Sequence, residues 1–216
     1  MTVRTEKILF LTLGIVFFFS GCSDLGFYWQ AASGHLDLLN RKQNIQEILD
    51  SPETSPGLKR KLKLVESVRT FAIEQMSLPE NEAYTAYVDL GRPYVTMVVT
   101  AAPPLELKAH QWCYFFVGCQ EYRGYFDEAD AVALAAEMKQ QELDVSVGPV
   151  TAYSTLGWLN KPWLPDYFSD PVLNTFLLQR DAELIATLIH EMAHQIVYVN
   201  NDTAFNESFA VFVEQE

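Results

Sequence analysis

The sequence predicts an α+β fold with a helical N-terminal part, a small β-sheet in the middle and a pair of helices at the end. Helix-type spacing of apolar residues dominates up to residue 76, short strand-type runs and one helix alternate over 94–150, and apolar helical patterns return from residue 181. Of the 216 residues, 49% are hydrophobic, which is enough for a buried core and excludes a disordered chain. The net charge of −13 argues against nucleic-acid binding.

The first 22 residues have the pattern of an export signal. A basic start precedes the apolar run from Ile8 to Phe19, whose 12 residues are too few for a transmembrane helix, which needs about 20. Phe19-Ser20-Gly21-Cys22 resembles the lipobox of bacterial lipoproteins, which implies that residues 1–21 are a signal peptide and that Cys22 is lipidated. The alternative is a plain signal peptide with a cysteine at its edge.

The lipoprotein resemblance carries expectations for location and for the rest of the chain. Ser23 after the cysteine implies the outer membrane, with the protein facing the periplasm. The acidic body should not bind anionic lipid, so the lipid at Cys22 would be the only membrane anchor. Residues 22–216 are expected to form a single domain. The remaining cysteines, Cys113 and Cys119, are expected to form a disulfide in an oxidising compartment; a redox or metal pair is the alternative.

Two helices are expected in the N-terminal part. Apolar residues recur at helical spacing from Leu36 to about Leu49, and Pro52 ends the pattern. A second helix is predicted from Gly57 to Met76, with Pro56 suited to its first turn.

The middle of the chain reads as strands around one helix. A β-branched strand is predicted at 94–100, stopped by the Pro103-Pro104 pair, and shorter strands follow at 112–117 and 122–126. Asp127 is expected to cap a helix at 129–143, and 144–150 is a further strand. The segment from Tyr153 to Trp158 could be an edge strand for a peptide substrate, with both aromatic residues in contact with it, or simply a strand and its turn.

The strongest functional signal lies in an apolar helix predicted at 181–200. His190-Glu191-Met192-Ala193-His194 is an H-E-x-x-H pattern, in which the histidines lie one turn apart on one helix face and can reach a single metal ion. Glu191 points about 100° away, which suits a general base that takes a proton from water at the metal. Two histidines satisfied within a buried helix are the alternative.

A zinc hydrolase usually has a third protein ligand. A second helix is predicted at 203–214, where Glu207 and Glu214 lie seven residues apart on one face, so both could point toward the metal. Asn206-Glu207-Ser208-Phe209-Ala210 resembles the segment of the gluzincin aminopeptidases whose glutamate is the third zinc ligand. In those enzymes the glutamate follows the second histidine at about the spacing of Glu214, whereas only 12 residues separate His194 from Glu207. Local sequence favours Glu207, which we take as the expected ligand, and spacing favours Glu214.

A narrower resemblance covers nearly everything after Cys22. The order of several short motifs is similar to that of the bacterial predicted aminopeptidases, zinc lipoproteins with an H-E-x-x-H site; the motifs include 34–36, 89–94, 112–113, 122–126, 153–158, 190–194 and 202–210. The resemblance implies a zinc metallopeptidase that hydrolyses peptides or proteins. Members of that family generally continue further, so the chain is expected to be C-terminally short.

Four further residues are candidates for supporting roles. Gln195 and Glu183 are candidates to support the metal ligands. Tyr198 and Tyr153 are candidates for the side chain that stabilises the oxyanion, which gluzincins supply from further downstream.

Two other functions are compatible with the sequence. One is an envelope-anchored binding or assembly lipoprotein whose metal is structural or absent. The other is a metalloprotease that acts on exported proteins, with the same site and a different substrate. The sequence makes no prediction of oligomeric state.

Overall fold

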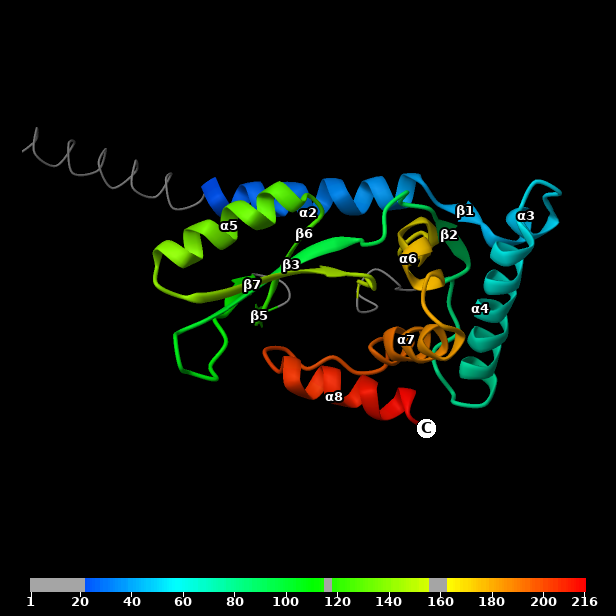
Figure 1. The fold of residues 1–216 in the computed structure, drawn as a ribbon. Coiled ribbons are helices and arrows are strands. Elements are labelled where there is room, and N and C mark those ends of the chain that lie inside the picture. The colour runs from blue at the N-terminus through cyan, green and yellow to red at the C-terminus, as the bar shows by residue number, and fades with distance from the viewer. Residues whose placement is uncertain (1–21, 115–117, 156–162) are drawn as a thin grey trace, which may run out of the picture. The chain divides into compact units, whose positions relative to one another are not determined.

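The structure, a computed structural model, describes residues 22–114, 118–155 and 163–216 (Figure 1). The predicted signal peptide, the side chain of Cys22 and Trp158 lie outside the described part, and the lipidation site therefore stays a prediction. The chain divides into two compact units, 1–37 and 38–216, and helix α2 (Cys22–Asn40) begins in the first. Within the described residues, no helix combines the length and the apolar character that crossing a membrane requires.

The predicted α+β class is confirmed by helices at both ends of the second unit and three small sheets between them. Strand β1 (Gln43–Asn44) interrupts the region where one helix was expected at 36–49, so that prediction is wrong. The chain turns because β1 pairs with β2 (Ala86–Val88), and the Asn44 side chain then caps α3 (Ile45–Asp50) by accepting from the amide of Gln46 at 2.8 Å. Helix α4 (Pro56–Glu74) matches its prediction.

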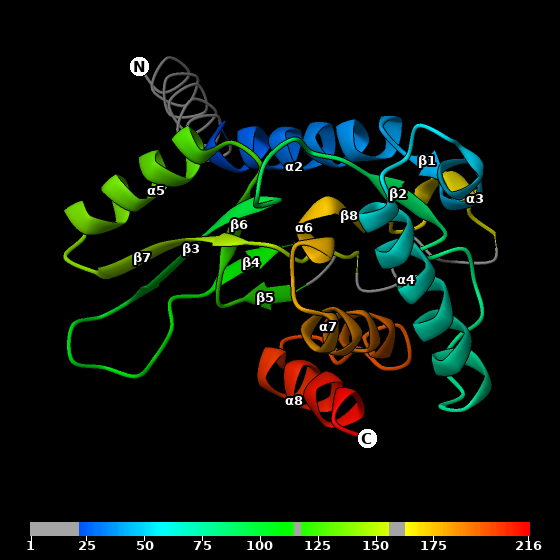
Figure 2. The same ribbon diagram turned by 45° about the vertical axis from the view of Figure 1, so that its right-hand side comes forward.

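The middle region forms an antiparallel sheet in the order β6-β3-β7. Its strands are β3 (Thr96–Ala102), β6 (Arg123–Tyr125) and β7 (Asp144–Val150), at or near the predicted positions. Helix α5 (Glu128–Gln140) packs on β3 and β7 (Figure 2), and Asp127 caps it as expected.

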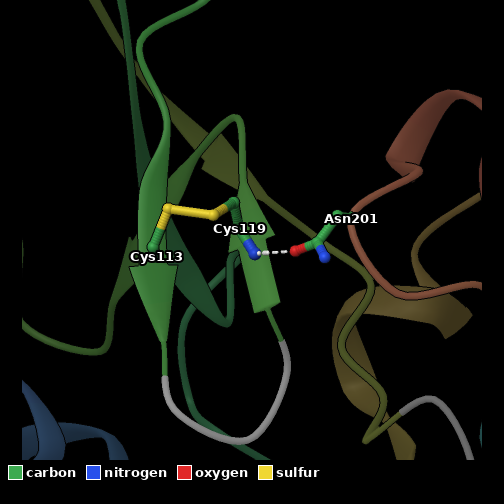
Figure 3. The surroundings of a disulfide bond; sticks show 3 residues. All are labelled: Cys113, Cys119 and Asn201. Atoms are coloured by element: carbon green, nitrogen blue, oxygen red, sulfur yellow. Dashed lines mark hydrogen bonds between the residues drawn. A yellow bond between two sulfur atoms is a disulfide. The ribbon is translucent and has the colours of Figure 1, made fainter.

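A separate two-stranded unit, which we call the disulfide hairpin, consists of β4 (Trp112–Tyr114) and β5 (Gly118–Gln120). The strands are antiparallel, and Cys113 lies directly opposite Cys119. The expected disulfide joins these two residues (Figure 3). Residues 115–117, the end of the strand predicted at 112–117, lie outside the described part.

The last quarter of the chain packs with residues 38–95 to form the main core. Strand β8 (Val172–Leu173) follows the short 3-10 helix η1 (Asp166–Phe168) and runs parallel to β2, completing the sheet β1-β2-β8. Then come α6 (Asn174–Leu177), α7 (Asp181–Ala193) and α8 (Thr203–Glu214). Helix α7 packs against α4, α6 and α8. Its start is tied to α4, where Arg60 and Lys61 pair with Asp181 at 2.6 and 2.9 Å.

Helix α7 ends at Ala193, seven residues before the predicted end at residue 200. The chain turns at 194–196, and the side chain of Asn206 then takes both backbone groups of Val199, accepting from its N–H at 2.8 Å and donating to its carbonyl at 2.9 Å. The pairing satisfies both backbone polar groups of Val199 outside a helix, and it ties the start of α8 to the chain that follows α7.

Candidate metal centre

Helix α7 carries His190, with His194 as the residue that caps its C-terminus, and it is fixed in place because its apolar face is buried in the core. Its buried residues are Leu184, Leu188, Ile189, Met192 and Ala193. His190 and His194, one turn apart, share the face toward α8. Their Nε2 atoms are 3.1 Å apart, and the side chain of His194 is 3% exposed. Two imidazoles thus present their Nε2 atoms at the same point.

Helix α8 brings a carboxylate to this point. The Glu207 Oε2 lies 3.2 Å from the Nε2 of His190 and 3.7 Å from the Nε2 of His194. Asp202 caps α8 by accepting from the amide of Phe205 at 2.9 Å, and the buried Asn206 anchors the helix beside Glu207. The structure therefore explains how a connection of 12 residues is enough: α7 ends at Ala193, and the chain turns back between the helices before α8 begins at Thr203.

The donor set fits a zinc ion. Two imidazole nitrogens and one carboxylate oxygen lie within 4.8 Å of one another, and this is a ligand set that zinc favours in hydrolytic sites. Tetrahedral ligands at the usual zinc bond lengths would be about 3.3 Å apart, close to the three spacings of 3.1, 3.2 and 3.7 Å. The side chain of Glu207 is 47% exposed, so the group faces solvent on one side.

The pKa shifts of His190 and Glu207 show that the group favours positive charge near its nitrogen atoms, as a metal site requires. The hydrogen bond with Glu207 raises the pKa of His190, and the same bond lowers the pKa of Glu207. Burial lowers the pKa of His194, which keeps its imidazole neutral and able to act as a ligand.

Glu214, the rival third ligand, contacts the other side of His190. Its Oε2 lies 3.0 Å from Nδ1, whereas Glu207 lies beside Nε2. Two helical turns separate the two glutamates, so both reach the same imidazole from one face of α8. When Nδ1–H donates to Glu214, Nε2 is left as the metal-binding atom. The geometry thus gives Glu214 an orienting position and leaves the ligand position to Glu207.

Glu191 lies on the neighbouring part of α7 and is held from outside the helix. The side chain of Ser154 forms a hydrogen bond with its carboxylate, and burial raises the pKa of Glu191. The segment that carries Ser154 is fixed in turn by Asp170, whose carboxylate accepts from the Thr155 amide at 3.0 Å and from the Thr155 hydroxyl at 2.9 Å. Sequence reasoning missed Ser154 and Asp170, although it singled out the segment around Ser154.

The predicted edge strand at 153–158 is not found in the described residues. Residues 151–155 belong to no strand, and the ring of Tyr153 packs 5.5 Å from that of Phe126. Asp170 binds the backbone of Thr155, and the neighbouring Ser154 forms a hydrogen bond with Glu191. The described part of this segment therefore helps to hold the Glu191 carboxylate. Substrate contact by Tyr153 stays a prediction.

The four candidates for supporting roles have different surroundings. Gln195 accepts from the Asn81 side chain at 2.7 Å. Glu183 pairs with Arg180 at the start of α7, two turns from His190, so its proposed support of the ligands is wrong. Tyr198 accepts from Gln120 at 3.0 Å.

Tyr122 was missed by sequence reasoning as a site residue. Burial of its hydroxyl and the charges of Glu207 and Glu191 raise its pKa to about 12, although 39% of the residue's surface is exposed. Its phenol is therefore protonated near neutral pH and lies within electrostatic reach of both carboxylates.

Replacing Asp170 by asparagine should change how stability depends on pH. Asp170 is 1% exposed, and burial raises its pKa from 3.8 to about 7. Between these values the folded protein holds a proton that the unfolded chain releases, so this group's contribution to stability falls as pH rises from about 4 to 7. The loss amounts to at most about 4 kcal/mol.

Asparagine cannot ionise but can still accept from Thr155. As pH rises from 4.5 to 8, we expect the unfolding free energy of Asp170→Asn to fall less than that of the unmodified protein. The measurement is denaturant unfolding with the disulfide intact. If the unfolding free energies of both proteins changed identically with pH, Asp170 would not have the raised pKa that its burial implies.

The family model described as "Putative aminopeptidase" matches residues 26–216. No curated protein and no solved structure matches the chain. The family match extends over the strands, the disulfide hairpin and the helix pair with the H-E-x-x-H pattern, and the chain therefore belongs to this aminopeptidase family.

Proposed function

We propose that the protein is a zinc-dependent metallopeptidase of the aminopeptidase type, with His190, His194 and Glu207 as metal ligands and Glu191 as general base. The observation that carries the proposal is the convergence of two Nε2 atoms and one carboxylate oxygen, 3.1 to 3.7 Å apart, on an H-E-x-x-H helix. A zinc ion at this point would polarise the carbonyl of a peptide bond and lower the pKa of water.

Glu191 has the properties that proton transfer requires. Its carboxylate can accept a proton from water and pass it to the leaving amine. Burial raises its pKa, which brings the two protonation states closer in free energy near neutral pH, and the hydrogen bond from Ser154 limits rotation of the carboxylate.

Tyr122 is the side chain that we assign to the substrate's developing oxyanion, in place of Tyr198 and Tyr153. The exposed part of the residue leaves room for a substrate, and a phenol with a pKa of about 12 remains a hydrogen-bond donor at neutral pH. Tyr198 already binds Gln120, and Tyr153 packs on Phe126.

The lipobox-like sequence at 19–22 is the basis of our proposal for the location and partners of the enzyme. We propose that Cys22 carries the lipid anchor and that the catalytic domain faces the periplasm from the outer membrane. Its substrates would then be peptides or exported proteins that reach that compartment.

The proposal is tested by hydrolysis of a peptide panel in which each peptide is supplied with a free and with an acetylated N-terminus. We expect turnover that a chelator abolishes and added zinc restores, and a preference for the free N-terminus. Cleavage of both forms would indicate an endopeptidase. The absence of turnover in zinc-loaded, folded protein would contradict the proposed activity and favour a binding or assembly role.

A further inference from the structure

The segment between the two helices of the site, residues 195–202, has little apolar anchoring of its own. Ile196, Val197 and Val199 are 36–45% exposed. In α8, all of whose residues are described, only Asn206 and Ala210 are buried. Polar contacts therefore add to the packing of α8 on α7 in holding Glu207, and Asn206 supplies two of them through the backbone of Val199.

The disulfide hairpin supplies further polar contacts to the segment 195–202. The backbone N–H of Cys119 donates to the Oδ1 of Asn201 at 2.7 Å, and Figure 3 shows this bond beside the bridge to Cys113. Gly118 makes the approach possible, because a Cβ at this position would lie 2.4 Å from the same Oδ1. Its φ of +74° is also one that glycine adopts without strain.

A second residue of the hairpin, Gln120, binds both the middle of the segment and the start of α8. The side-chain amide of Gln120 donates to the Tyr198 hydroxyl at 3.0 Å and accepts from the Thr203 hydroxyl at 3.2 Å. Thr203 is the first residue of α8, and Glu207 follows it by four residues on the same helix face. The hairpin thus contacts the helical turn from which the third ligand projects.

We propose that the disulfide hairpin positions Glu207 through the side chain of Asn201, so that zinc affinity depends on Asn201 and on the Cys113–Cys119 bridge. The inference rests on the proposed function, since it takes Glu207 as a ligand. The bridge holds β4 and β5 together and keeps the Cys119 amide in place, and Asn201 transmits that position to the start of α8. Asn201 is a positioning residue, because its own side chain binds the hairpin.

The backbone conformation of Asn201 allows a clean substitution. Its φ is +61°, in the left-handed region that glycine occupies without strain. Asn201→Gly therefore removes the contact with the hairpin without forcing the turn to change. Asn201→Asp is the matched control, because a carboxylate of the same shape still accepts from the Cys119 amide.

The test is zinc affinity of the purified mature chain made soluble by Cys22→Ser, measured by competition with a chromogenic chelator. We expect Asn201→Gly to bind zinc about tenfold or more weakly, as for residues that orient metal ligands, and Asn201→Asp to bind as tightly as the unmodified protein. The double variant Cys113→Ser/Cys119→Ser should resemble Asn201→Gly. Should that variant fail to fold, the two Asn201 variants still decide the question.

The possible failures can be told apart. If the unmodified protein binds zinc and Asn201→Gly binds it equally tightly, the positioning role is overturned and the proposed metal site stands. If the unmodified protein binds no zinc, the proposed function fails, and this inference fails with it.

Discussion

Glu191→Gln should lower the rate of peptide hydrolysis by about 10²- to 10⁴-fold, the range that general acid–base catalysis contributes, and should leave zinc bound. Glutamine has nearly the same shape and can still bond to Ser154, but it cannot take a proton from water. Because the proposed ligands are His190, His194 and Glu207, and Glu191 is not among them, the metal should stay. The measurement is kcat/KM on a cleaved peptide together with zinc content.

Glu183→Gln is the matched control for this experiment. Glu183 lies on the same helix, but its carboxylate binds Arg180 at the helix start. Its loss should have little effect on hydrolysis. A Glu191→Gln variant that kept its full rate would show that another group takes the proton, and one that lost its zinc would show that Glu191 acts in metal binding.

The two glutamates of α8 should differ in their effects on zinc affinity. Glu214→Gln keeps an oxygen that can accept from the Nδ1–H of His190, so its effect should stay within the roughly 10- to 100-fold loss typical of residues that orient a ligand. Glu207→Ala removes a ligand and should exceed that loss.

Competition with a chelator for zinc gives both affinities under the same conditions. The reverse order, with Glu214→Gln the more damaging, would make Glu214 the third ligand, as the spacing from His194 suggests. We expect the larger loss of affinity from Glu207→Ala because Glu207 lies beside the Nε2 of His190, the proposed metal-binding atom. Glu214 lies beside the Nδ1 of the same ring.

Local sequence was sufficient wherever one segment determines its own structure. The β-branched run at 94–100, the proline at the start of α4 and the cap at Asp127 all predicted elements that the structure contains. The separation of His190 and His194 by one turn is likewise a property of a single helix. Helical spacing alone could not choose between Glu207 and Glu214, because both lie on one face of α8.

What sequence reasoning missed depends on contacts between distant segments. The helix expected at 36–49 is broken because Gln43 and Asn44 pair with a strand more than forty residues away. Ser154 reaches Glu191, and Asn201 reaches Cys119, across long stretches of chain. A single sequence holds no periodicity or spacing that would reveal such pairs.

Zinc content of the folded protein tests the central claim most directly. The measurement uses mature chain made soluble by Cys22→Ser, beside the same chain with His190→Ala. The account predicts about one zinc ion per chain in the first, from three protein ligands at one site, and a loss of zinc in the second. A well-folded protein without zinc, or a zinc content unchanged by His190→Ala, would contradict the metal centre and the hydrolase mechanism built on it.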